Sequence, residues 1–256
     1  MNLLLSEILN TFYSGLWPML RISALLATAP FFSISVVSIR IRIILGIALT
    51  IFVYPNYDWP LIDPFSALGI LEILNQIFIG CLMGLTLQIV VASVVIAGQA
   101  ISNSLGLSMA TLIDPALGNV PTISQLLMIM CTLIFMSTGG HLILISSVCN
   151  SFMKVPIGVS LLDTVTWGKL LSWSSLMFFG GLLISLPIVA TMLIINVGLG
   201  IVSRSAPSLN IFSVGFPALI VVGLFATLIS VESIGYRIEW LWQKAFITLS
   251  DILQAP

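Results

Sequence analysis

Charged side chains are scarce in this sequence of 256 residues: 8 are Lys or Arg, 9 are Asp or Glu, and together they make up 7% of the chain. Soluble domains carry about 25% charged residues, so an ordinary soluble enzyme is excluded. Disorder is excluded as well, because a disordered chain needs low hydrophobicity, whereas 59% of these residues are hydrophobic. The net charge of −1 offers no cluster of cations that could bind a nucleic acid.

Groups that bind metals or catalyse reactions are equally scarce. His141 is the only histidine, and Cys81, Cys131 and Cys149 lie in apolar runs without C-x-x-C spacing. A zinc site and a disulfide framework are therefore not supported, and the cysteines are predicted to be small buried apolar residues. No G-x-S-x-G or P-loop motif occurs either. We predict a protein that is not an enzyme and that holds no cofactor or metal.

Long uncharged apolar stretches are what the sequence has in abundance. No charged residue occurs between Glu72 and Asp114 or between Asp114 and Lys154, and two further long gaps follow Lys169 and Arg204. About 20 apolar residues suffice to cross a bilayer as a helix, and no strand-like alternation occurs. We predict an all-α integral membrane protein with about six apolar segments, some of them forming kinked helical hairpins. The expected helices are 8–35, 41–54, 66–102, 123–150, 168–203 and 210–250.

Three features interrupt the apolar pattern. Pro187 and Pro217 should kink the last two helices, because proline removes a backbone donor and clashes with the preceding turn. Residues 139–141, Gly-Gly-His, indicate a close helix contact or a local break, with a proton relay as the alternative. Residues 54–60 are rich in Tyr, Trp and Pro, which is typical of an exposed aromatic turn at a membrane interface.

Ionisable residues near apolar segments are candidates for function, because burying them is costly. Here they are Arg21, Glu72, Asp114, Arg204 and Glu232. They fall at the edges of the apolar segments, which favours pairing at interfaces or helix ends over a proton-coupled carrier. Counting Lys and Arg on alternate loops gives no consistent orientation under the positive-inside rule. Either one segment does not span, or the chain does not cross lipid as a simple serpentine.

The most unusual segment, 106–122, joins two apolar stretches but is neither charged enough nor polar enough for a solvent loop. Its glycines and prolines oppose a continuous helix, and irregular backbone at membrane depth is tolerated only inside protein or along a cavity. We predict an apolar plug or gate in a pore, with a purely structural re-entrant connection as the alternative. The predicted plug residues are Gly106, Leu107, Met109, Asp114, Pro115, Gly118 and Pro121.

A second candidate site lies where an arginine, a proline and an asparagine separate the last two apolar helices. Arg204 is expected to pair with a carboxylate or with carbonyls at a helix end. The predicted residues for assembly and helix breaking are Arg204, Pro207, Asn210 and Pro217.

Two long motifs resemble the FliR family of type III export-gate proteins, which is related to the SpaR and YscT components of virulence injectisomes. They run from Gly106 to Pro115 and from Gly198 to Phe212, the second followed by Gly-Phe-Pro at 215–217. Shorter matches extend the similarity over nearly the whole chain; they are Gln99, Gly140-His141, Ser151-Phe152 and Pro187.

The resemblance implies a non-enzymatic core subunit of the flagellar type III protein export gate, in the bacterial inner membrane at the flagellar basal body. Implied partners are FliP-like and FliQ-like subunits, FlhB-like and FlhA-like export components, membrane lipid and the unfolded proteins that are exported. Residues 1–165 would be FliP-like and 166–256 FliQ-like, and segment 106–122 lies where the family has its plug loop. An injectisome export-gate subunit and a stand-alone membrane transporter remain the alternatives.

Overall fold

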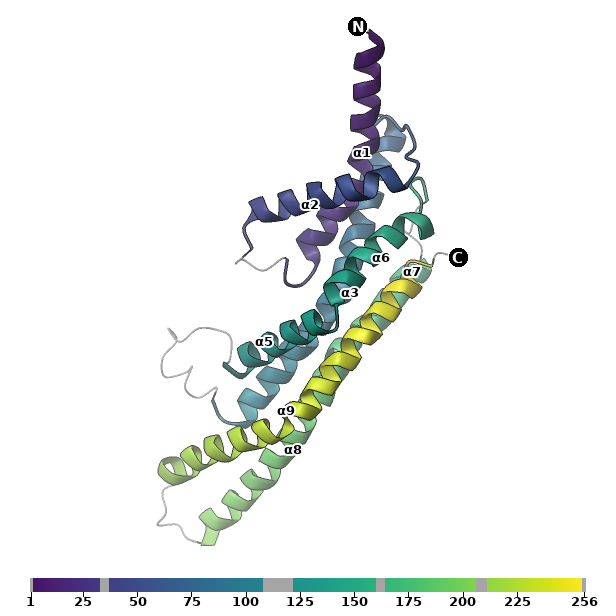
Figure 1. Ribbon diagram of the computed structural model, residues 1–256. Coiled ribbons are helices and arrows are strands. Elements are labelled where there is room, and N and C mark those ends of the chain that lie inside the picture. The colour runs from purple at the N-terminus through teal and green to yellow at the C-terminus, as the bar shows by residue number, and fades with distance from the viewer. Residues whose placement is uncertain (1, 33–36, 108–121, 160–163, 206–210, 255–256) are drawn as a thin grey trace. The chain divides into compact units, whose positions relative to one another are not determined.

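In the computed structural model, the described part of the chain is built from α-helices (Figure 1). The structure describes residues 2–32, 37–107, 122–159, 164–205 and 211–254, and within these ranges no strand occurs. The predicted all-α fold is therefore confirmed. In chain order the helices are α1 (Asn2–Thr28), α2 (Ile39–Val53), the single 3-10 turn η1 (Tyr54–Asn56), α3 (Ala67–Ser104), α5 (Thr122–Ser137), α6 (Gly140–Lys154), α7 (Thr164–Ser174), α8 (Leu176–Ser205) and α9 (Ile211–Ile252).

Three helices match the sequence prediction to within two residues at each end: α2, α3 and α9. The start of α3 could be predicted because a single local residue, Ser66, caps the helix there. The Gly69 N–H donates a hydrogen bond of 3.0 Å to the hydroxyl of Ser66, the residue before the helix. Ser66 thus satisfies a backbone donor that the first turn leaves free, as an N-cap does.

The expected helix 8–35 was wrong at both ends, since α1 begins at Asn2 and ends at Thr28. Pro30 explains the early end, because the ring of a proline disfavours helical geometry at the residue before it. The chain then turns through Phe31, whose φ of 72° lies in the left-handed region.

The expected single helices 123–150 and 168–203 are each two helices. The first divides into α5 and α6 at Gly139, whose φ of 70° is left-handed and ends the regular hydrogen-bond pattern. The local break expected at 139–141 is thus confirmed. The second begins at Thr164 and divides into α7 and α8 at Ser175. Both α8 and α9 continue through their prolines, and the kinks expected there stay predictions.

Two compact units make up the chain, and each draws on distant parts of the sequence. Unit 1 comprises Met1–Ile89, Gly139–Ser174 and Lys244–Pro256, and unit 2 comprises Val90–Thr138 and Ser175–Gln243. Helices α3 and α9 contribute residues to both. This division does not test the expected FliP-like and FliQ-like portions, which stay a prediction.

In unit 1, the backbones of α1 and α3 touch where α3 carries two glycines four residues apart. A Cβ at Gly80 would lie 2.8 Å from the Cβ of Ala24, and a Cβ at Gly84 would lie 2.8 Å from the backbone nitrogen of Ala29. Only hydrogen fits at either position. Such small-xxx-small spacing lets helices approach closely without bulky side chains between them.

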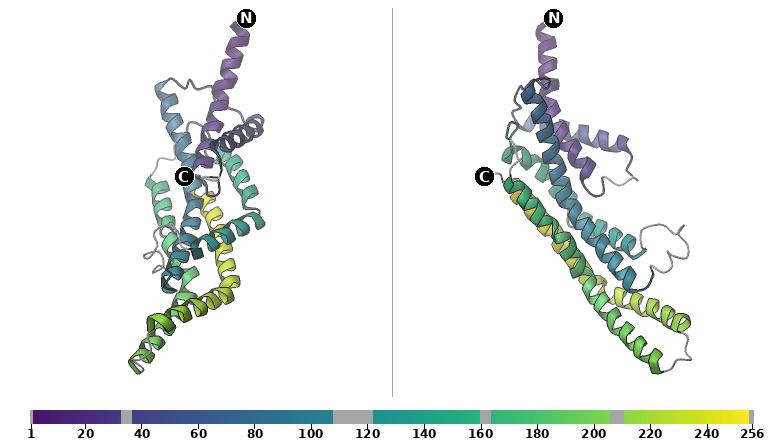
Figure 2. Two further views of the ribbon diagram at one scale, coloured as in Figure 1. Left: turned by 90° about the vertical axis from the view of Figure 1, so that its left-hand side faces the viewer. Right: turned by 180° about the vertical axis from the view of Figure 1, so that it is seen from behind.

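In unit 2, glycines likewise allow helices to pack closely. A Cβ at Gly98 of α3 would lie 2.5 Å from the Cα of Ser124 on α5, and a Cβ at Gly181 of α8 would lie 2.8 Å from the Ile96 side chain on α3. Within this unit α8 and α9 run side by side in opposite directions, as Figures 1 and 2 show. The interior is apolar, with Leu105 among its fully buried side chains.

Four helical segments among the described residues are long and apolar enough to cross a membrane, and the bent pair α5 and α6 makes a fifth if it forms one span. The four are Ile39–Asn56, Ala67–Ser104, Val165–Ser205 and Pro217–Ile252. These segments support an all-α membrane protein. Helix α1 is not among the candidate spans.

Candidate functional site

Arg21 is the most completely bound polar side chain in unit 1, although it sits within the apolar helix α1. It is fully buried. Its Nε donates to the side-chain oxygen of Gln76 at 2.7 Å, and one terminal nitrogen donates to the carbonyl of Ser151 at 2.9 Å and to its hydroxyl at 3.0 Å. The other terminal nitrogen donates to the Val155 carbonyl at 2.9 Å. The guanidinium also lies 4.3 Å from the ring centre of Phe152.

The countercharge for Arg21 is Glu72, which acts through Gln76 and not by direct contact. The Gln76 amide accepts from Arg21 and donates to the Glu72 carboxylate, so one glutamine joins a buried cation to a buried anion. Burial lowers the pKa of Arg21 to about 9, and the Glu72 charge opposes this shift. Arg21 therefore stays protonated at neutral pH, and its charge is balanced within the cluster.

This cluster ties three helices together. Ser151 belongs to the last turn of α6 and Val155 directly follows this helix, and the Ser151 carbonyl also accepts the Val155 N–H at 2.9 Å. A cation at a helix C-terminus is favourable because the carbonyls there carry partial negative charge. Asn75, one turn from Glu72 on α3, donates to the Val159 carbonyl at 2.8 Å and holds the connection that follows α6. We call Arg21, Glu72, Asn75, Gln76 and Ser151 the Arg21 cluster.

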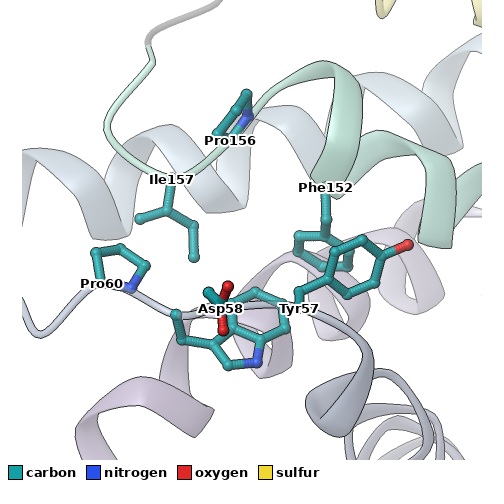
Figure 3. Close-up of a pocket in the computed structure, with 7 residues that line it drawn as sticks. Tyr57, Asp58, Pro60, Phe152, Pro156 and Ile157 are labelled. Atoms are coloured by element: carbon teal, nitrogen blue, oxygen red, sulfur yellow. The ribbon is translucent and has the colours of Figure 1, made fainter.

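An aromatic hollow of about 420 Å³ lies against the same end of α6 (Figure 3). Figure 3 shows Asp58 in its floor, with Tyr57 and Phe152 on one side, Pro60 on the other, and Pro156 and Ile157 opposite. Its lining consists of Tyr57, Asp58, Trp59, Pro60, Phe152, Pro156 and Ile157. We call it the Asp58 hollow. A turn is thus observed at 54–60, but its aromatic rings are half-buried and not exposed as expected, and Trp59 packs on Phe152 of α6.

A second hollow of about 410 Å³ lies beside the same turn. Both hollows are lined by Tyr57, Asp58 and Trp59. The polar part of the second lining includes Ser14, whose hydroxyl is 2.8 Å from the Tyr54 hydroxyl.

Two lysines of unit 1 bind the C-terminal end of α9. The Lys154 ammonium donates to the Ser250 carbonyl at 3.2 Å, and the Lys169 ammonium donates to the Asp251 carbonyl at 3.0 Å. Both contacts place a cation at the carbonyl end of a helix, where the Ser250 carbonyl also accepts the Gln254 N–H at 3.2 Å. These two lysines were not among the candidate ionisable residues, but they serve helix ends as was expected of those candidates.

For Arg21 only the placement at a segment edge was wrong, because this residue lies inside α1 and is buried. The expected pairing with a helix end holds, since Arg21 donates to the Ser151 and Val155 carbonyls at the end of α6. Its partners Gln76 and Ser151 were not among the predicted site residues. The available signal was the spacing of Glu72, Asn75 and Gln76 in an otherwise apolar helix, since residues i, i+3 and i+4 share one helix face.

Only two of the predicted plug residues, Gly106 and Leu107, lie within the described residues. They form the cap that ends α3. The Leu107 N–H donates to the Ser102 carbonyl at 3.1 Å, and the Gly106 N–H donates to the Asn103 carbonyl at 3.1 Å, with a φ of 76° at Gly106. This is the Schellman motif, in which a left-handed glycine satisfies the last carbonyls. Met109, Asp114, Pro115, Gly118 and Pro121 lie outside the described residues.

The second predicted site is described only at its edges. Arg204 is exposed in the last turn of α8, where a cation suits the helix end, and within the described part of the chain no carboxylate pairs with it. Pro217 is exposed inside α9, and Pro207 and Asn210 lie outside the described residues. The structure does not bring these residues into contact with the plug residues that it describes.

The cysteines are free, as the sequence analysis expected. Cys131 is buried, whereas Cys81 and Cys149 are half-buried, so the prediction of buried apolar residues holds fully for one of the three.

Comparison with known proteins extends over almost all of the chain. The family described as "Bacterial export proteins, family 1" matches residues 12–245. The flagellar biosynthetic protein FliR of Pectobacterium carotovorum subsp. carotovorum is 35% identical over 248 residues, which cover 96% of this chain and 95% of the relative. FliR of Escherichia coli (strain K12) is 34% identical, covering 93% of this chain and 91% of the relative. FliR of Bacillus subtilis (strain 168) is 26% identical, covering 97% and 98%.

Proposed function

Since this chain belongs to the FliR family of bacterial export proteins, we propose that it is a non-enzymatic core subunit of the flagellar type III protein export gate. The observation that carries the proposal is the match to proteins named flagellar biosynthetic protein FliR along nearly the full length of both chains. We place the subunit in the bacterial inner membrane at the flagellar basal body. Its apolar helices support a membrane location.

We further propose that the subunit assembles with FliP-like and FliQ-like subunits, and that FlhB-like and FlhA-like components work with them. Large apolar surfaces within the chain support such assembly. In the candidate span Pro217–Ile252 only 17% of the most apolar window is buried inside the chain, and in Ile39–Asn56 only 11%. Lipid or other subunits must cover these surfaces, because exposed apolar patches of this extent mark interaction sites.

Co-expression with tagged FliP-like and FliQ-like subunits tests this function directly. A gate subunit should co-purify with both, and deleting its gene should abolish motility and the export of flagellar proteins. A chain that purifies as a stable monomer or homo-oligomer and does not bind these subunits would indicate a stand-alone transporter. Restored secretion by an injectisome, with no effect on motility, would favour the injectisome alternative.

For segment 106–122 we propose the plug of the export channel. Support comes from its apolar composition and from its start, since Gly106 ends α3 in a left-handed cap that turns the chain out of the helix. A hydrophobic constriction can gate by excluding water, so shortening it should admit ions.

Deleting residues 110–118 should therefore raise the ion conductance of the membrane and slow growth while the complex still assembles. Conductance and complex yield are measured in the same strain. Lost assembly without leakage would support the structural alternative, and an assembled complex that stays impermeable would rule out a plug.

A further inference from the structure

The turn at 54–61 combines aromatic rings and a carboxylate in a way that the gate function leaves unexplained. It lies between the candidate spans Ile39–Asn56 and Ala67–Ser104. Asp58 lines both hollows. Its side chain is exposed, and within the described part of the chain no hydrogen bond or ion pair engages the carboxylate.

The walls of the Asp58 hollow are fixed by their own contacts. The Tyr57 hydroxyl donates to the Cys149 carbonyl at 2.8 Å, and the Trp59 indole N–H donates to the Tyr54 carbonyl at 2.7 Å. The Trp59 and Phe152 rings meet edge to face with centroids 5.3 Å apart. A ligand would meet a wall that is already in place, so binding would cost little ordering of these side chains.

Aromatic rings beside a carboxylate select a cation. The rings attract it through their negative faces, and the carboxylate accepts its hydrogen bonds. Among the described residues that line either hollow, none is Lys, Arg or His. A phospholipid headgroup brings a phosphate with its ammonium, and neither lining offers that phosphate a countercharge. A bare ammonium or guanidinium fits this lining better.

Two cations of this chain close to Phe152, Arg21 in space and Lys154 in sequence, are engaged elsewhere. Arg21 contacts Phe152 but directs its hydrogen bonds to the Arg21 cluster. Lys154 donates to the Ser250 carbonyl. Since no cation of the described residues lines either hollow, we look for the cation on another molecule.

We propose that the Asp58 hollow receives a lysine or arginine side chain from a neighbouring subunit of the export gate. This inference rests on the proposed function, since it requires a partner polypeptide. The carboxylate binds the cationic head, and the Trp59 and Tyr57 rings cover the apolar stem, as long basic side chains prefer.

Asp58→Asn is the first test, with Asp63→Asn as the matched control. Asp63 is an exposed carboxylate shortly after the turn that lines neither hollow, and an asparagine there can still accept from the Phe65 N–H. Both variants remove one negative charge. Recovery of the complex with FliP-like and FliQ-like subunits should fall about ten-fold for Asp58→Asn, equal to about 1.4 kcal/mol, and stay unchanged for Asp63→Asn. Equal recovery for both, or a lower thermal midpoint of the Asp58→Asn chain itself, overturns the proposal.

Identification of the cation is the second test. A photo-reactive phenylalanine analogue replaces Leu61, an exposed residue beside the turn that lines the second hollow. In the purified complex it should crosslink to a partner peptide that contains a lysine or arginine. Combining Asp58→Lys with an acidic substitution of that cation should restore recovery. Crosslinking only to lipid, or no rescue by the double reversal, overturns the docking site.

The two proposals fail in different ways. If the wild-type chain does not co-purify with these subunits, the export-gate function itself is wrong. If it does, and Asp58→Asn behaves as wild type, only the docking site is wrong.

Discussion

Replacing Arg21 by methionine tests whether the Arg21 cluster holds α1, α3 and α6 together. Methionine has a similar length, so the change removes charge and hydrogen bonds and leaves little empty space. Four hydrogen bonds are lost, and they involve Gln76, both oxygens of Ser151, and the Val155 carbonyl. Glu72 is left buried without a cation.

The expected cost is about 3–5 kcal/mol, the usual loss when one partner of a buried charge pair is removed. The sum of four charged hydrogen bonds would be larger, but removing the guanidinium also removes the cost of burying it. In a chain of this size 1 kcal/mol shifts the melting temperature by about 2–4 °C. Arg21→Met should therefore lower it by roughly 6–20 °C.

The assay heats detergent-solubilised membranes and measures how much tagged chain stays soluble. Lys244→Met, which removes an exposed cation from α9, serves as the control and should melt like wild type. Adding Glu72→Gln to Arg21→Met should recover about 1 kcal/mol or more, because the uncompensated anion is then gone. A melting temperature of Arg21→Met within 2 °C of wild type, by the scale above, would refute the role of the cluster. If the stability changes of Arg21→Met and Glu72→Gln simply added in the double variant, the coupling of the two charges through Gln76 would be refuted.

Three further substitutions separate packing, capping and assembly. Gly84→Ala should destabilise the chain by about 1–3 kcal/mol, because a Cβ there meets Ala29. Gly235→Ala is the control: its Cβ would have nothing within 4 Å, so stability should stay unchanged or rise slightly. The same heating assay compares the two variants. Gly106→Ala should cost about 1 kcal/mol, because its φ of 76° is strained for alanine, and hydrogen exchange should show faster opening of the last turn of α3. Arg204→Ala should lower the yield of the complex with FliP-like and FliQ-like subunits. Since Arg204 is exposed, the melting temperature of the chain itself should not change. Normal yield and motility would show that Arg204 has no role in assembly.

Most of the helical fold could be predicted from the sequence, because long uncharged stretches are helices in lipid or protein surroundings. The ends of α3 were predictable for a local reason, with Ser66 before it and Gly106 after it. The break between α5 and α6 was harder. Gly139 was recognised as an interruption, but its left-handed conformation, and not composition, decides that one helix becomes two.

The Arg21 cluster could not be predicted in the same way, because its partners are distant in sequence. Arg21 lies 130 residues from Ser151 and 55 from Gln76. From sequence alone, Arg21 separates two apolar runs and resembles a residue at a membrane edge. Only the polar side chains on one face of α3 indicated that something charged would pack there.

Long-range contacts also account for the inconsistent positive-inside count. That rule assumes that lysines and arginines are free to face the cytoplasm and the lipid headgroups. Here two of the eight, Lys154 and Lys169, donate to backbone carbonyls at the end of α9. Their positions are set by the helix ends that they stabilise. Counting them as loop charges assigns them an orientation signal that they do not carry, so the orientation of this chain must be sought from its remaining cations and from its partners.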